Sequence, residues 1–336
     1  MMINIGISGF GRIGKLVFRI IEDLRINNKE NIRVVGINCP SITSENMRYL
    51  INYDSVHKFD KYKIEVFDNY IIINDNKITL FRERNPSNIK WDEVNVNYVI
   101  DSTGRFTSKE DASKHFNSKG VKKVIITAPC SDIPMYVVGV HMDNYNNEKI
   151  VSNASCTTNC LAPIAKVIND YVGIEEGFVS TIHSITSSQN TLDSRASKNI
   201  RIGRSSNNII PSTTGATKAL GVIIPELSGK ISGLSFRVPT PNVSILDFSF
   251  KTSEKTNYEE LIERLKYESE NLLKGIIDFS YEELVSNDYI GNKNSCIIDI
   301  NLGKQIGDNF FKIVAWYDNE YGYSNRVVDL LKVIVN

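Results

Sequence analysis

A cysteine that opens a helical segment, and a histidine 27 positions later, are the residues of this chain best suited to covalent chemistry. From Cys156 to about Asp170 the apolar residues follow helical spacing. Backbone N–H groups and the helix dipole at a helix N-terminus favour negative charge, which lowers a cysteine pKa. His183, in a predicted strand, could serve as the base of a thiolate–imidazolium pair that attacks a carbonyl. The alternative is a buried cysteine and a hydrogen-bonded strand histidine.

The remaining cysteines and histidines suit other chemistry less well. His57 and His141 fall at predicted loop edges, and we expect His115 on an exposed helix face. Five cysteines at irregular spacings fit neither a disulfide framework nor a zinc site, so we predict reduced thiols and no metal. Cys160, one helical turn after Cys156, is expected to be a packed small residue, with a disulfide formed on oxidation as the alternative.

Hydroxyl and guanidinium groups that could hold phosphate oxygens follow the cysteine. An arginine offers a fork for bidentate contacts, and threonine or glycine N–H groups offer neutral donors. Residues 211–216 read as a loop that enters a helix, whose N-terminus suits an anion. Each residue alone could be a cap or a solvated charge, but together they predict two anion sites near the thiol. The candidates are Thr186, Arg201, Arg204, Thr214, Gly215 and Arg237.

A glycine-rich turn near the start of the chain predicts a dinucleotide site. The residues Gly9-Phe10-Gly11-Arg12-Ile13-Gly14 follow an apolar strand and precede a helical segment from Lys15 to Leu24. A second apolar strand follows at Ile32–Asn38. Glycines in this β-α-β context allow the tight turn and let the backbone approach a pyrophosphate.

The order of predicted elements indicates an α/β protein of two domains. Strands at 70–73, 78–81, 98–102 and 121–127, with a helix at 109–118, extend a Rossmann-type doubly wound parallel sheet. Longer strands at 177–185, 231–239, 244–251, 295–301 and 310–316 predict an α+β catalytic domain with a mostly antiparallel sheet. We place the dinucleotide-binding domain at 1–154, completed by a C-terminal helix at 324–336, and the catalytic domain at 155–323. A polar segment without periodicity, about 189–212, is too long for a casual connection and is expected to be functional.

Composition restricts the class of partner. Lys and Arg number 39 and Asp and Glu number 39, so the net charge of zero argues against a nucleic-acid partner held by positive charge. No stretch is apolar for long enough to span a bilayer. Because the first strand begins at Ile3, no room is left for a leader sequence, and we expect a cytoplasmic protein.

Six segments together resemble the phosphorylating glyceraldehyde-3-phosphate dehydrogenases, over essentially the whole chain. They are the glycine-rich turn, Tyr53-Asp54-Ser55-Val56-His57, Ser102-Thr103-Gly104, residues 153–160 around Cys156, residues 236–240 and Trp316-Tyr317-Asp318-Asn319-Glu320. The resemblance implies a homotetramer in which 189–212 is the S-loop at a subunit interface. It also implies NAD or NADP as cofactor and inorganic phosphate as second substrate.

The resemblance also assigns roles to residues. Cys156 would be the nucleophile, which forms a hemithioacetal and then a thioester, and His183 its base. Ser155, Thr157, Thr214 and Gly215 would contact inorganic phosphate; Thr186, Arg237 and an S-loop arginine, Arg201, would contact the substrate's C3 phosphate. The cofactor-binding positions would be Gly9, Phe10, Gly11, Arg12, Ile13, Cys39, Arg84, Thr103, Gly104, Thr127 and Asn319, with Asn319 on the nicotinamide carboxamide.

Two departures from the family pattern concern the adenosine end of the cofactor. Cys39 stands where the family carries an aspartate that binds the ribose and repels a 2′-phosphate, and no carboxylate lies nearby in the sequence. Ser194 and Arg195 stand where NAD-preferring relatives carry a small or apolar residue and a proline. A lost carboxylate and a gained guanidinium suit a 2′-phosphate. We therefore predict that NADP is accepted, with Arg195 as a 2′-phosphate contact; the alternative is drift with NAD still preferred.

Two other activities stay open at this point. Erythrose-4-phosphate dehydrogenases share the architecture and the thiol, although residues 209–215 look like the triose enzyme. A Cys–His hydrolase would use the same pair without a cofactor, but the sequence offers no obvious orienting Asn or Asp for it.

Overall fold

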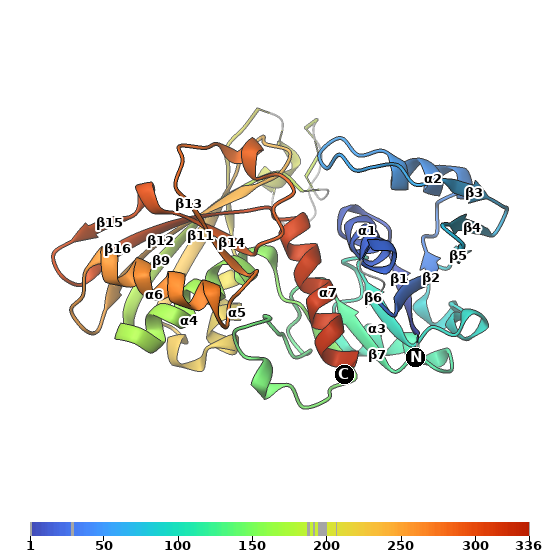
Figure 1. Cartoon of the computed structure of the whole chain (residues 1–336), viewed down its shortest axis with the longest axis horizontal. Helices are drawn as coiled ribbons and strands as arrows, with labels where there is room; N and C mark the ends of the chain where they lie inside the picture. The colour runs from blue at the N-terminus through green and yellow to red at the C-terminus, as the bar shows by residue number, and fades with distance from the viewer. Residues whose placement is uncertain are drawn as a thin grey trace. The chain divides into compact units, whose positions relative to one another are not determined.

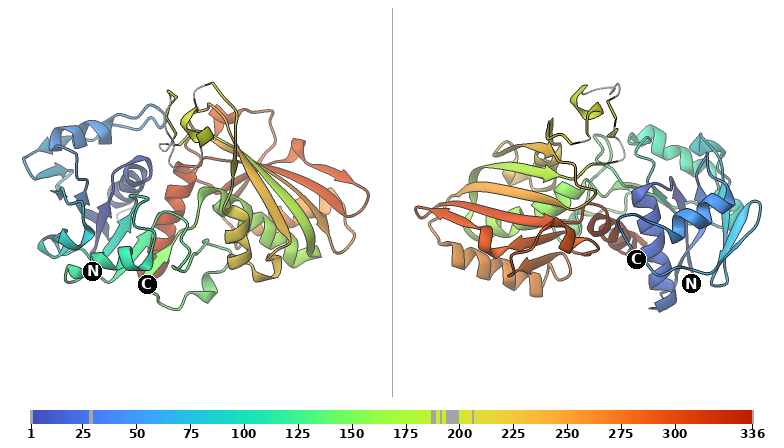
Figure 2. Two further views of the ribbon diagram at one scale, coloured as in Figure 1. Left: turned by 180° about the vertical axis from the view of Figure 1, so that it is seen from behind. Right: turned by 90° about the horizontal axis from the view of Figure 1, so that it is seen from above.

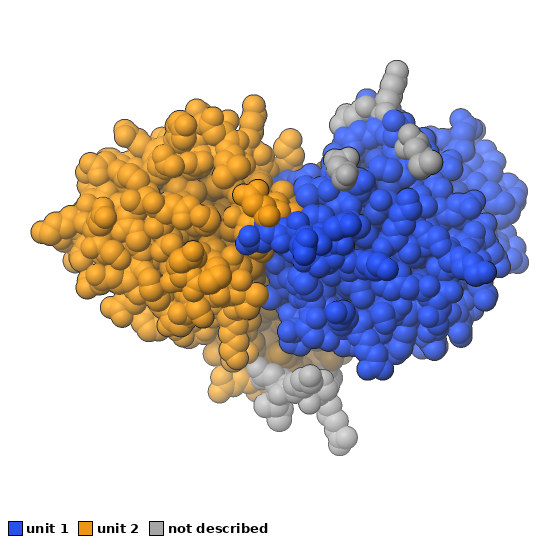
Figure 3. Space-filling model, turned by 90° about the horizontal axis from the view of Figure 1, so that it is seen from below, with its two compact units in different colours: residues 1–136, 144–154, 324–336 blue, residues 137–143, 155–323 orange. Residues whose placement is uncertain are grey.

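The computed structural model describes residues 2–27, 30–186, 189–190, 192–193, 200–205 and 207–335. Its internal contacts divide the chain into two compact units (Figure 3). Unit 1 comprises Met1–Tyr136, Asn144–Ala154 and Ser324–Asn336; unit 2 comprises Val137–Asp143 and Ser155–Tyr323.

Unit 1 is built on an eight-stranded sheet with the strand order β3-β4-β5-β2-β1-β6-β7-β8. All neighbours from β5 to β8 pair in parallel, and β3 and β4 add an antiparallel edge. The parallel strands are rich in Ile and Val and mostly buried, as expected for a sheet covered on both faces. The strands are β1 (Ile3–Ser8), β2 (Ile32–Asn38), β3 (Ile64–Val66), β4 (Tyr70–Ile73), β5 (Asn76–Phe81), β6 (Tyr98–Asp101), β7 (Lys123–Ile126) and β8 (Ile150–Ser152).

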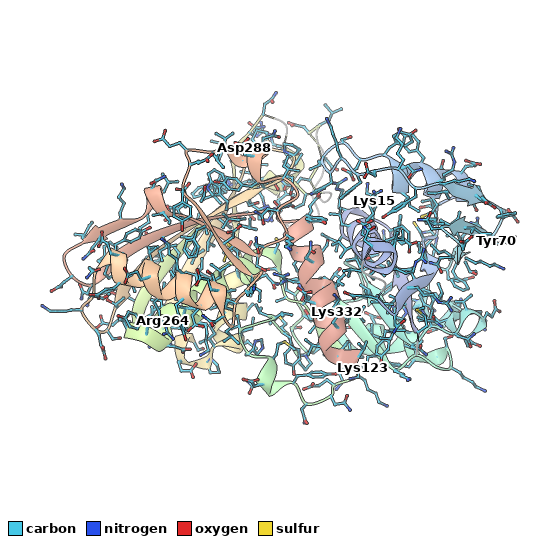
Figure 4. The ribbon with its side chains drawn as sticks, in the orientation of Figure 1. Lys15, Tyr70, Lys123, Arg264, Asp288 and Lys332 are labelled. Carbon is cyan, nitrogen blue, oxygen red and sulfur yellow. The ribbon has the colours of Figure 1, made fainter. Side chains whose placement is uncertain are left out.

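Helices surround this sheet, and the last of them comes from the C-terminal end of the chain. They are α1 (Arg12–Asn27), α2 (Ser44–Asn52), α3 (Lys109–Ser113) and residues 324–335 of α7 (Tyr321–Val335), with short 3-10 turns η1 (Pro86–Asn88), η2 (Trp91–Val94) and η3 (Lys114–Asn117). A further 3-10 turn, η4 (Met142–Asn144), begins in unit 2 and ends in unit 1. Lys332 of α7 pairs with Glu30 at 2.9 Å, and the Lys123 Nζ donates to the Ile334 carbonyl at 2.9 Å (Figure 4). The C-terminal helix is thereby tied to residues from the first half of the chain.

The strand order of unit 1 reverses between β1 and β6. β2 lies on one side of β1, and β6, the start of the second half of the sheet, lies on the other. In open parallel sheets the crevice at such a switch point, beyond the carboxyl ends of the strands, is where nucleotides bind. The glycine-rich turn follows β1 and the Ser102-Thr103-Gly104 segment follows β6, so the topology brings both predicted cofactor segments to this point.

Unit 2 is built on a second sheet with the order β10-β11-β9-β12-β16-β14-β13, in which β15 also pairs with β16. Among the strands of unit 2 that the structure describes, β9–β11 and β13–β14 are the parallel pairs. Helices α4 (Cys156–Val172), α5 (Ala216–Ile223) and α6 (Tyr258–Glu270) cover one face of this sheet (Figures 1 and 2). The strands are β9 (Ile174–His183), β10 (Ile210–Thr213), β11 (Ile231–Arg237), β12 (Ser244–Thr252), β13 (Ile277–Ser280), β14 (Cys296–Asp299), β15 (Lys304–Ile306) and β16 (Phe310–Tyr317), and the 3-10 turns are η5 (Ile200–Gly203), η6 (Pro225–Leu227), η7 (Ser286–Tyr289) and η8 (Ile300–Leu302).

The predicted fold class is confirmed, since a parallel-dominated sheet and a mostly antiparallel sheet are both present. Details of several elements were wrong. The helix expected at 109–118 is a single turn of α-helix followed by 3-10 turns, and α6 was not predicted. His115, expected on an exposed helix face, is fully buried and bonds Asp101 at 3.0 Å and Trp91 at 3.2 Å. None of the helices in the described part of the chain is long and apolar enough to cross a membrane.

Candidate active site

Cys156 is the first residue of α4, and the helix start is fixed by its neighbours. Ser155 is the N-cap, whose Oγ accepts the Thr158 N–H at 3.0 Å and contacts the Thr158 hydroxyl at 2.6 Å. Ala154, just before it, has φ +54°, a left-handed conformation that strains a residue with a Cβ. The backbone therefore turns sharply into the helix at the thiol, a kind of strain found mainly where function requires it.

His183 lies beside this thiol, as the sequence predicted. The Cys156 Sγ and the His183 Nε2 are 3.5 Å apart. His183 ends β9, on the buried face of the strand that α4 packs against, together with Val179 and Thr181. Because side chains alternate along a strand, this face is the one that can present an imidazole to the start of α4.

Burial shifts the pKa values of both groups. Burial raises the pKa of the Cys156 thiol above its ordinary value, while the charge of Arg237 and the N–H groups of the helix start lower that pKa by less. Burial, and then the positive charge of Arg237, lower the pKa of His183 to about 3. At the thiol, loss of solvation therefore opposes the effect of the helix N-terminus on the pKa.

Arg237 is the cation of this site. The register of the parallel pair β9–β11 sets Arg237 directly opposite His183, 54 residues apart in the sequence. The Arg237 Nη1 is 2.7 Å from the His183 Nδ1 and donates to the Ser184 carbonyl at 3.2 Å. Arg237 was predicted as a phosphate ligand; its contact with the base was not predicted, since strand register is not readable from the sequence.

Tyr317 supports both reacting side chains and was quoted in a motif without a role. Its hydroxyl bonds the hydroxyls of Thr157 at 3.0 Å and Thr181 at 2.8 Å. Its ring meets the His183 imidazole edge to face, with centroids 6.1 Å apart. Burial raises the pKa of Tyr317, so the phenol stays protonated and can donate one of its two bonds. Tyr317 thus links α4, β9 and β16 behind the thiol.

Asn319 is held with its amide in one orientation. Its Oδ1 accepts from the hydroxyls of Ser184 and Ser244, each at 2.9 Å. The Ser244 Oγ accepts the Ser184 N–H in turn, at 3.1 Å. With the oxygen occupied by two donors, the Nδ2 group is the end that can donate to a ligand such as a carboxamide. Val243, which precedes Ser244, has φ +66°, an outlier for a β-branched residue.

In unit 1 the glycine-rich turn has the geometry a pyrophosphate requires. Gly9 has φ +88°, and a Cβ on Gly14 would lie 2.2 Å from the Gly9 carbonyl oxygen. Gly11, by contrast, has open space where a Cβ would be. It immediately precedes the first residue of α1, Arg12, so a phosphate could approach the N–H groups of the helix start. These residues fit a bound dinucleotide.

A buried carboxylate that sequence reasoning left without a role organises the start of α1. Asp54 accepts from Arg12 Nη1 at 2.7 Å and Nη2 at 3.1 Å, and also pairs with Lys15. It accepts the N–H groups of Val56 and His57 at 2.8 and 3.0 Å. Burial alone would raise the pKa of Asp54, but these donors outweigh it and hold the pKa well below its usual range. Asp54 belongs to one of the segments that carry the resemblance to the family. Its physical role is to hold two cations, Arg12 and Lys15, at the glycine-rich turn.

The adenosine end is only partly as predicted. Cys39 follows β2 and is partly exposed. However, the Asn38 side chain exchanges two hydrogen bonds with the backbone of Glu83, at 3.0 and 2.9 Å. The backbone of Glu83, far from Asn38 in the sequence, is thus held at this strand end. Arg84 comes next and is exposed; Ser194 and Arg195 lie outside the described residues.

The other predicted cofactor residues follow β6 and β7. The Thr103 N–H and hydroxyl both donate to the Asp101 carboxylate, at 3.0 and 2.6 Å, and Gly104 has open space around its Cβ position. Thr127 follows β7, and its N–H donates to the Asp101 carbonyl at 3.0 Å. The Ser102 hydroxyl donates to the Gly9 carbonyl at 2.7 Å, which joins this segment to the glycine-rich turn. Asp101, with its buried partner His115, supports this segment and was not predicted from the sequence.

The predicted phosphate ligands are placed less tightly. The Thr157 hydroxyl is engaged by Tyr317, and the Thr214 Oγ1 accepts the Ala216 N–H at 3.2 Å at the start of α5, where Gly215 is the N-cap. The Thr186 N–H donates to Gln189 at 3.1 Å, and Arg201 is exposed on η5. Their binding of phosphate stays a prediction.

Cys160 is fully buried, and its thiol lies against that of Cys296. Burial, and then the contact with Cys296, raise the pKa of Cys160 well above the ordinary value.

A Rossmann-type unit together with a unit that carries a Cys–His pair and an amide donor defines a class, the NAD-dependent oxidoreductases. Family comparison agrees: residues 3–109 match the NAD-binding domain of glyceraldehyde 3-phosphate dehydrogenase, and residues 155–319 match its C-terminal domain. The chain belongs to the glyceraldehyde-3-phosphate dehydrogenase family.

Full-length relatives carry the same name. The chain is 49% identical to glyceraldehyde-3-phosphate dehydrogenase 1 of Kluyveromyces marxianus, over 98% of this chain and 99% of that protein. It is 47% identical to glyceraldehyde-3-phosphate dehydrogenase 2 of Saccharomyces cerevisiae, over 98% of both chains. It is 49% identical to the cytosolic enzyme of Ginkgo biloba, over 98% of this chain and 96% of that protein.

Proposed function

We propose that this enzyme oxidises D-glyceraldehyde 3-phosphate, with inorganic phosphate, to 1,3-bisphosphoglycerate through covalent adducts on Cys156. The observation that carries the proposal is the 3.5 Å contact between the Cys156 Sγ and the His183 Nε2 at the start of a helix. A thiol there can add to an aldehyde while its neighbour takes up the proton.

In the first half of the reaction the sulfur of Cys156 bonds to the aldehyde carbon and gives a hemithioacetal. The His183 Nε2 takes the hydroxyl proton of that adduct as hydride leaves its carbon, and a thioester remains. NAD, when bound, supplies the hydride acceptor. The Asn319 Nδ2 would donate to its carboxamide and fix which ring face receives the hydride, because the Asn319 Oδ1 is already occupied by two serine hydroxyls.

In the second half inorganic phosphate attacks the thioester carbon and releases the Cys156 sulfur. We assign contacts with that phosphate to Ser155, Thr157, Thr214 and Gly215. Contacts with the C3 phosphate fall to Thr186, Arg201 and Arg237. Arg237 is the best supported of these, since its guanidinium lies at the base itself.

The experiment is a spectrophotometric assay of reduced nicotinamide with glyceraldehyde 3-phosphate and NAD. Steady-state absorbance should rise only when phosphate or arsenate is supplied, and Cys156→Ser should abolish the rise while the fold, followed by circular dichroism, persists. Product formed without NAD would instead support a hydrolase. Equal rates with erythrose 4-phosphate would support the other dehydrogenase.

For the cofactor we propose that NADP is accepted beside NAD. Cys39 has no carboxylate that would repel a 2′-phosphate. Arg84 is exposed and follows Glu83, whose backbone bonds Asn38 at the end of β2. Arg195 is the proposed 2′-phosphate contact. Initial rates with each cofactor, in wild type and Arg195→Ala, test this. A preference for NAD of about a hundredfold would end the proposal.

The proposed assembly is a homotetramer with the S-loop, 189–212, at a subunit interface. One face of the unit 2 sheet supports this: Phe178, Leu234 and Phe310 lie on the same face and are 71, 42 and 43% exposed. Apolar side chains on an open sheet face are typical of interfaces. Light scattering should give four times the chain mass of 37.9 kDa, and a monomer would contradict it.

A glycolytic role in the cytoplasm completes the proposal. It rests on relatives named as cytosolic enzymes in Ginkgo biloba and Pinus sylvestris. Imaging of a tagged protein in its own cells tests the location, and a wholly organellar signal would contradict it.

A further inference from the structure

A buried chain of hydrogen bonds runs from the core of unit 1 to the predicted cofactor segment after β6. The Trp91 Nε1–H donates to the His115 Nδ1 at 3.2 Å, and the His115 Nε2 lies 3.0 Å from the Asp101 Oδ2. The Asp101 Oδ1 accepts the N–H and the hydroxyl of Thr103, at 3.0 and 2.6 Å. Trp91 and His115 are fully buried, and Asp101 is 1% exposed. An unmatched donor anywhere in this chain would therefore stay without water and cost free energy.

The tautomer of His115 is fixed by its two partners. An indole N–H can only donate, so the His115 Nδ1 accepts from Trp91 and carries no proton. The ring proton is therefore on Nε2, which donates to the Asp101 carboxylate. The same carboxylate accepts twice from Thr103. All donors of the chain thus point towards Asp101, and each has one acceptor to match it.

The indole at the core end of the chain is held in one place. Trp91 begins η2, and its ring lies against β1 and β2. A Cβ on Gly6 would be 2.8 Å from the ring, and a Cβ on Gly36 would be 3.1 Å from it, so the two glycines make room for the indole. Phe81 meets the ring edge to face, with centroids 5.3 Å apart. Because the interior is close-packed, the indole cannot shift to relieve a mismatch at its N–H.

The other end of the chain lies against the glycine-rich turn. A Cβ on Gly9 would be 2.8 Å from the Thr103 nitrogen, and the Ser102 hydroxyl donates to the Gly9 carbonyl at 2.7 Å. The Thr103 Oγ1 also accepts the Arg105 N–H at 3.1 Å, across Gly104 with φ +65°. The carboxylate that holds Thr103 thus sets the turn that both predicted cofactor residues of this segment share.

We propose that Trp91 and His115 are positioning residues for the cofactor. The indole N–H selects the Nε2–H tautomer of His115, and that tautomer orients the Asp101 carboxylate, which in turn holds Thr103 and Gly104. The inference deepens the proposed function at its cofactor site. It rests on the predicted contact of Thr103 and Gly104 with NAD and is independent of the chemistry at the thiol.

Asp101→Asn places one donor too many in this chain. If the new Oδ1 keeps both bonds of Thr103, the new Nδ2 faces the Nε2–H of His115. If His115 moves its proton to Nδ1, that proton faces the Trp91 N–H. If the amide turns over, its Nδ2 faces the Thr103 N–H. Each arrangement buries two opposed donors. Trp91→Phe removes the indole N–H, so that His115 can carry its proton on Nδ1 and accept from the amide.

The test is calorimetric titration of the full-length protein with NAD. Asp101→Asn should raise the Kd about tenfold, the factor for one unmatched buried donor. Trp91→Phe alone should raise it about threefold or less, because the bond between His115 and Asp101 remains. The double variant should bind NAD about fivefold more tightly than Asp101→Asn, whereas losses at independent sites would add. The matched control is Trp316→Phe, which removes a buried indole N–H bonded to Asp299 in unit 2 and should not rescue Asp101→Asn.

A readout without NAD follows the tautomer itself. The His115 signals in ¹⁵N-histidine NMR can be assigned by their loss in His115→Gln or through their contact with the Trp91 indole. They should show the Nε2–H tautomer in wild type and the Nδ1–H tautomer in the double variant. An Nδ1–H tautomer in wild type would overturn the proposal even if Asp101→Asn failed to fold, and so would a double variant that binds NAD no more tightly than Asp101→Asn. Wild type that binds no NAD would instead refute the cofactor site of the proposed function.

Discussion

Replacement of Asp54 by asparagine should destabilise unit 1 and weaken dinucleotide binding. The Asp54 Oδ1 accepts from Arg12 Nη2 and from two backbone N–H groups, and an asparagine oxygen can keep those three bonds. The Oδ2 accepts from Arg12 Nη1 and Lys15. In the variant an NH₂ group would replace the Oδ2 atom. This group can only donate, so it cannot accept the hydrogen bonds of Arg12 and Lys15. Two charge-assisted bonds are lost at a carboxylate that is 4% exposed, so we expect a cost of about 3 kcal/mol.

The assay is thermal unfolding with and without NAD, against pH. A cost of about 3 kcal/mol corresponds to a fall in Tm of about 6–12 °C. The pKa of Asp54 is lowered on folding, so its stabilisation is present above the unfolded pKa, about 4, and is lost as the pH falls through the lower folded value. The difference in Tm between wild type and variant should therefore be constant above about pH 5 and shrink below about pH 4.

Asp170→Asn is the matched control, since it breaks an exposed pair with Lys166 on α4. An exposed pair of this spacing contributes about 0.5 kcal/mol or less. If Asp54→Asn were no more destabilising than this control, or if its effect were unchanged at about pH 3, the buried cluster would not have the role given to it here.

Two substitutions and one labelling experiment test unit 2. Ser244→Ala removes one of the two donors to the Asn319 Oδ1 and should raise the KM for NAD by about tenfold while Tm stays within a few degrees; an unchanged KM would show that Ser184 alone orients the amide. Tyr317→Phe removes two buried hydroxyl contacts and should lower the free energy of unfolding by about 2 kcal/mol in urea titrations, whereas a loss under about 0.5 kcal/mol would contradict the bridging role. In the ligand-free protein, alkylation of Cys156 by iodoacetamide should keep rising from about pH 7 to about pH 9, because the thiol pKa is raised, and mass spectrometry should find Cys160 and Cys296 unlabelled. A rate that levels off below about pH 7 would refute the raised pKa.

Local patterns were sufficient to predict the parts of the fold that depend on neighbours in the chain. The turn at Gly9–Gly14 with its flanking strand and helix, the helix that starts at Cys156 and the pairing of that thiol with His183 follow from residue types and spacing. Helix α6 was missed because its apolar stripe, Leu261, Ile262 and Leu265, is short among many charged residues.

Other features depend on pairings that no local pattern contains. Strand register sets Arg237 opposite His183, and loops far apart in the sequence bring Asp54 to Arg12 and Glu83 to Asn38. The environment of the thiol depends on such pairings too. The helix start is visible in the sequence, but the burial that raises the pKa of Cys156 is not.

The central claim, that the Cys156 sulfur carries the substrate, is tested most directly by intact-protein and peptide mass spectrometry. Enzyme mixed with glyceraldehyde 3-phosphate and NAD, without phosphate, should gain the mass of the 3-phosphoglyceroyl group on the peptide that contains Cys156. Added phosphate should remove that mass, and Cys156→Ser should never acquire it. No adduct in wild type, or an adduct on any other residue, would contradict the account.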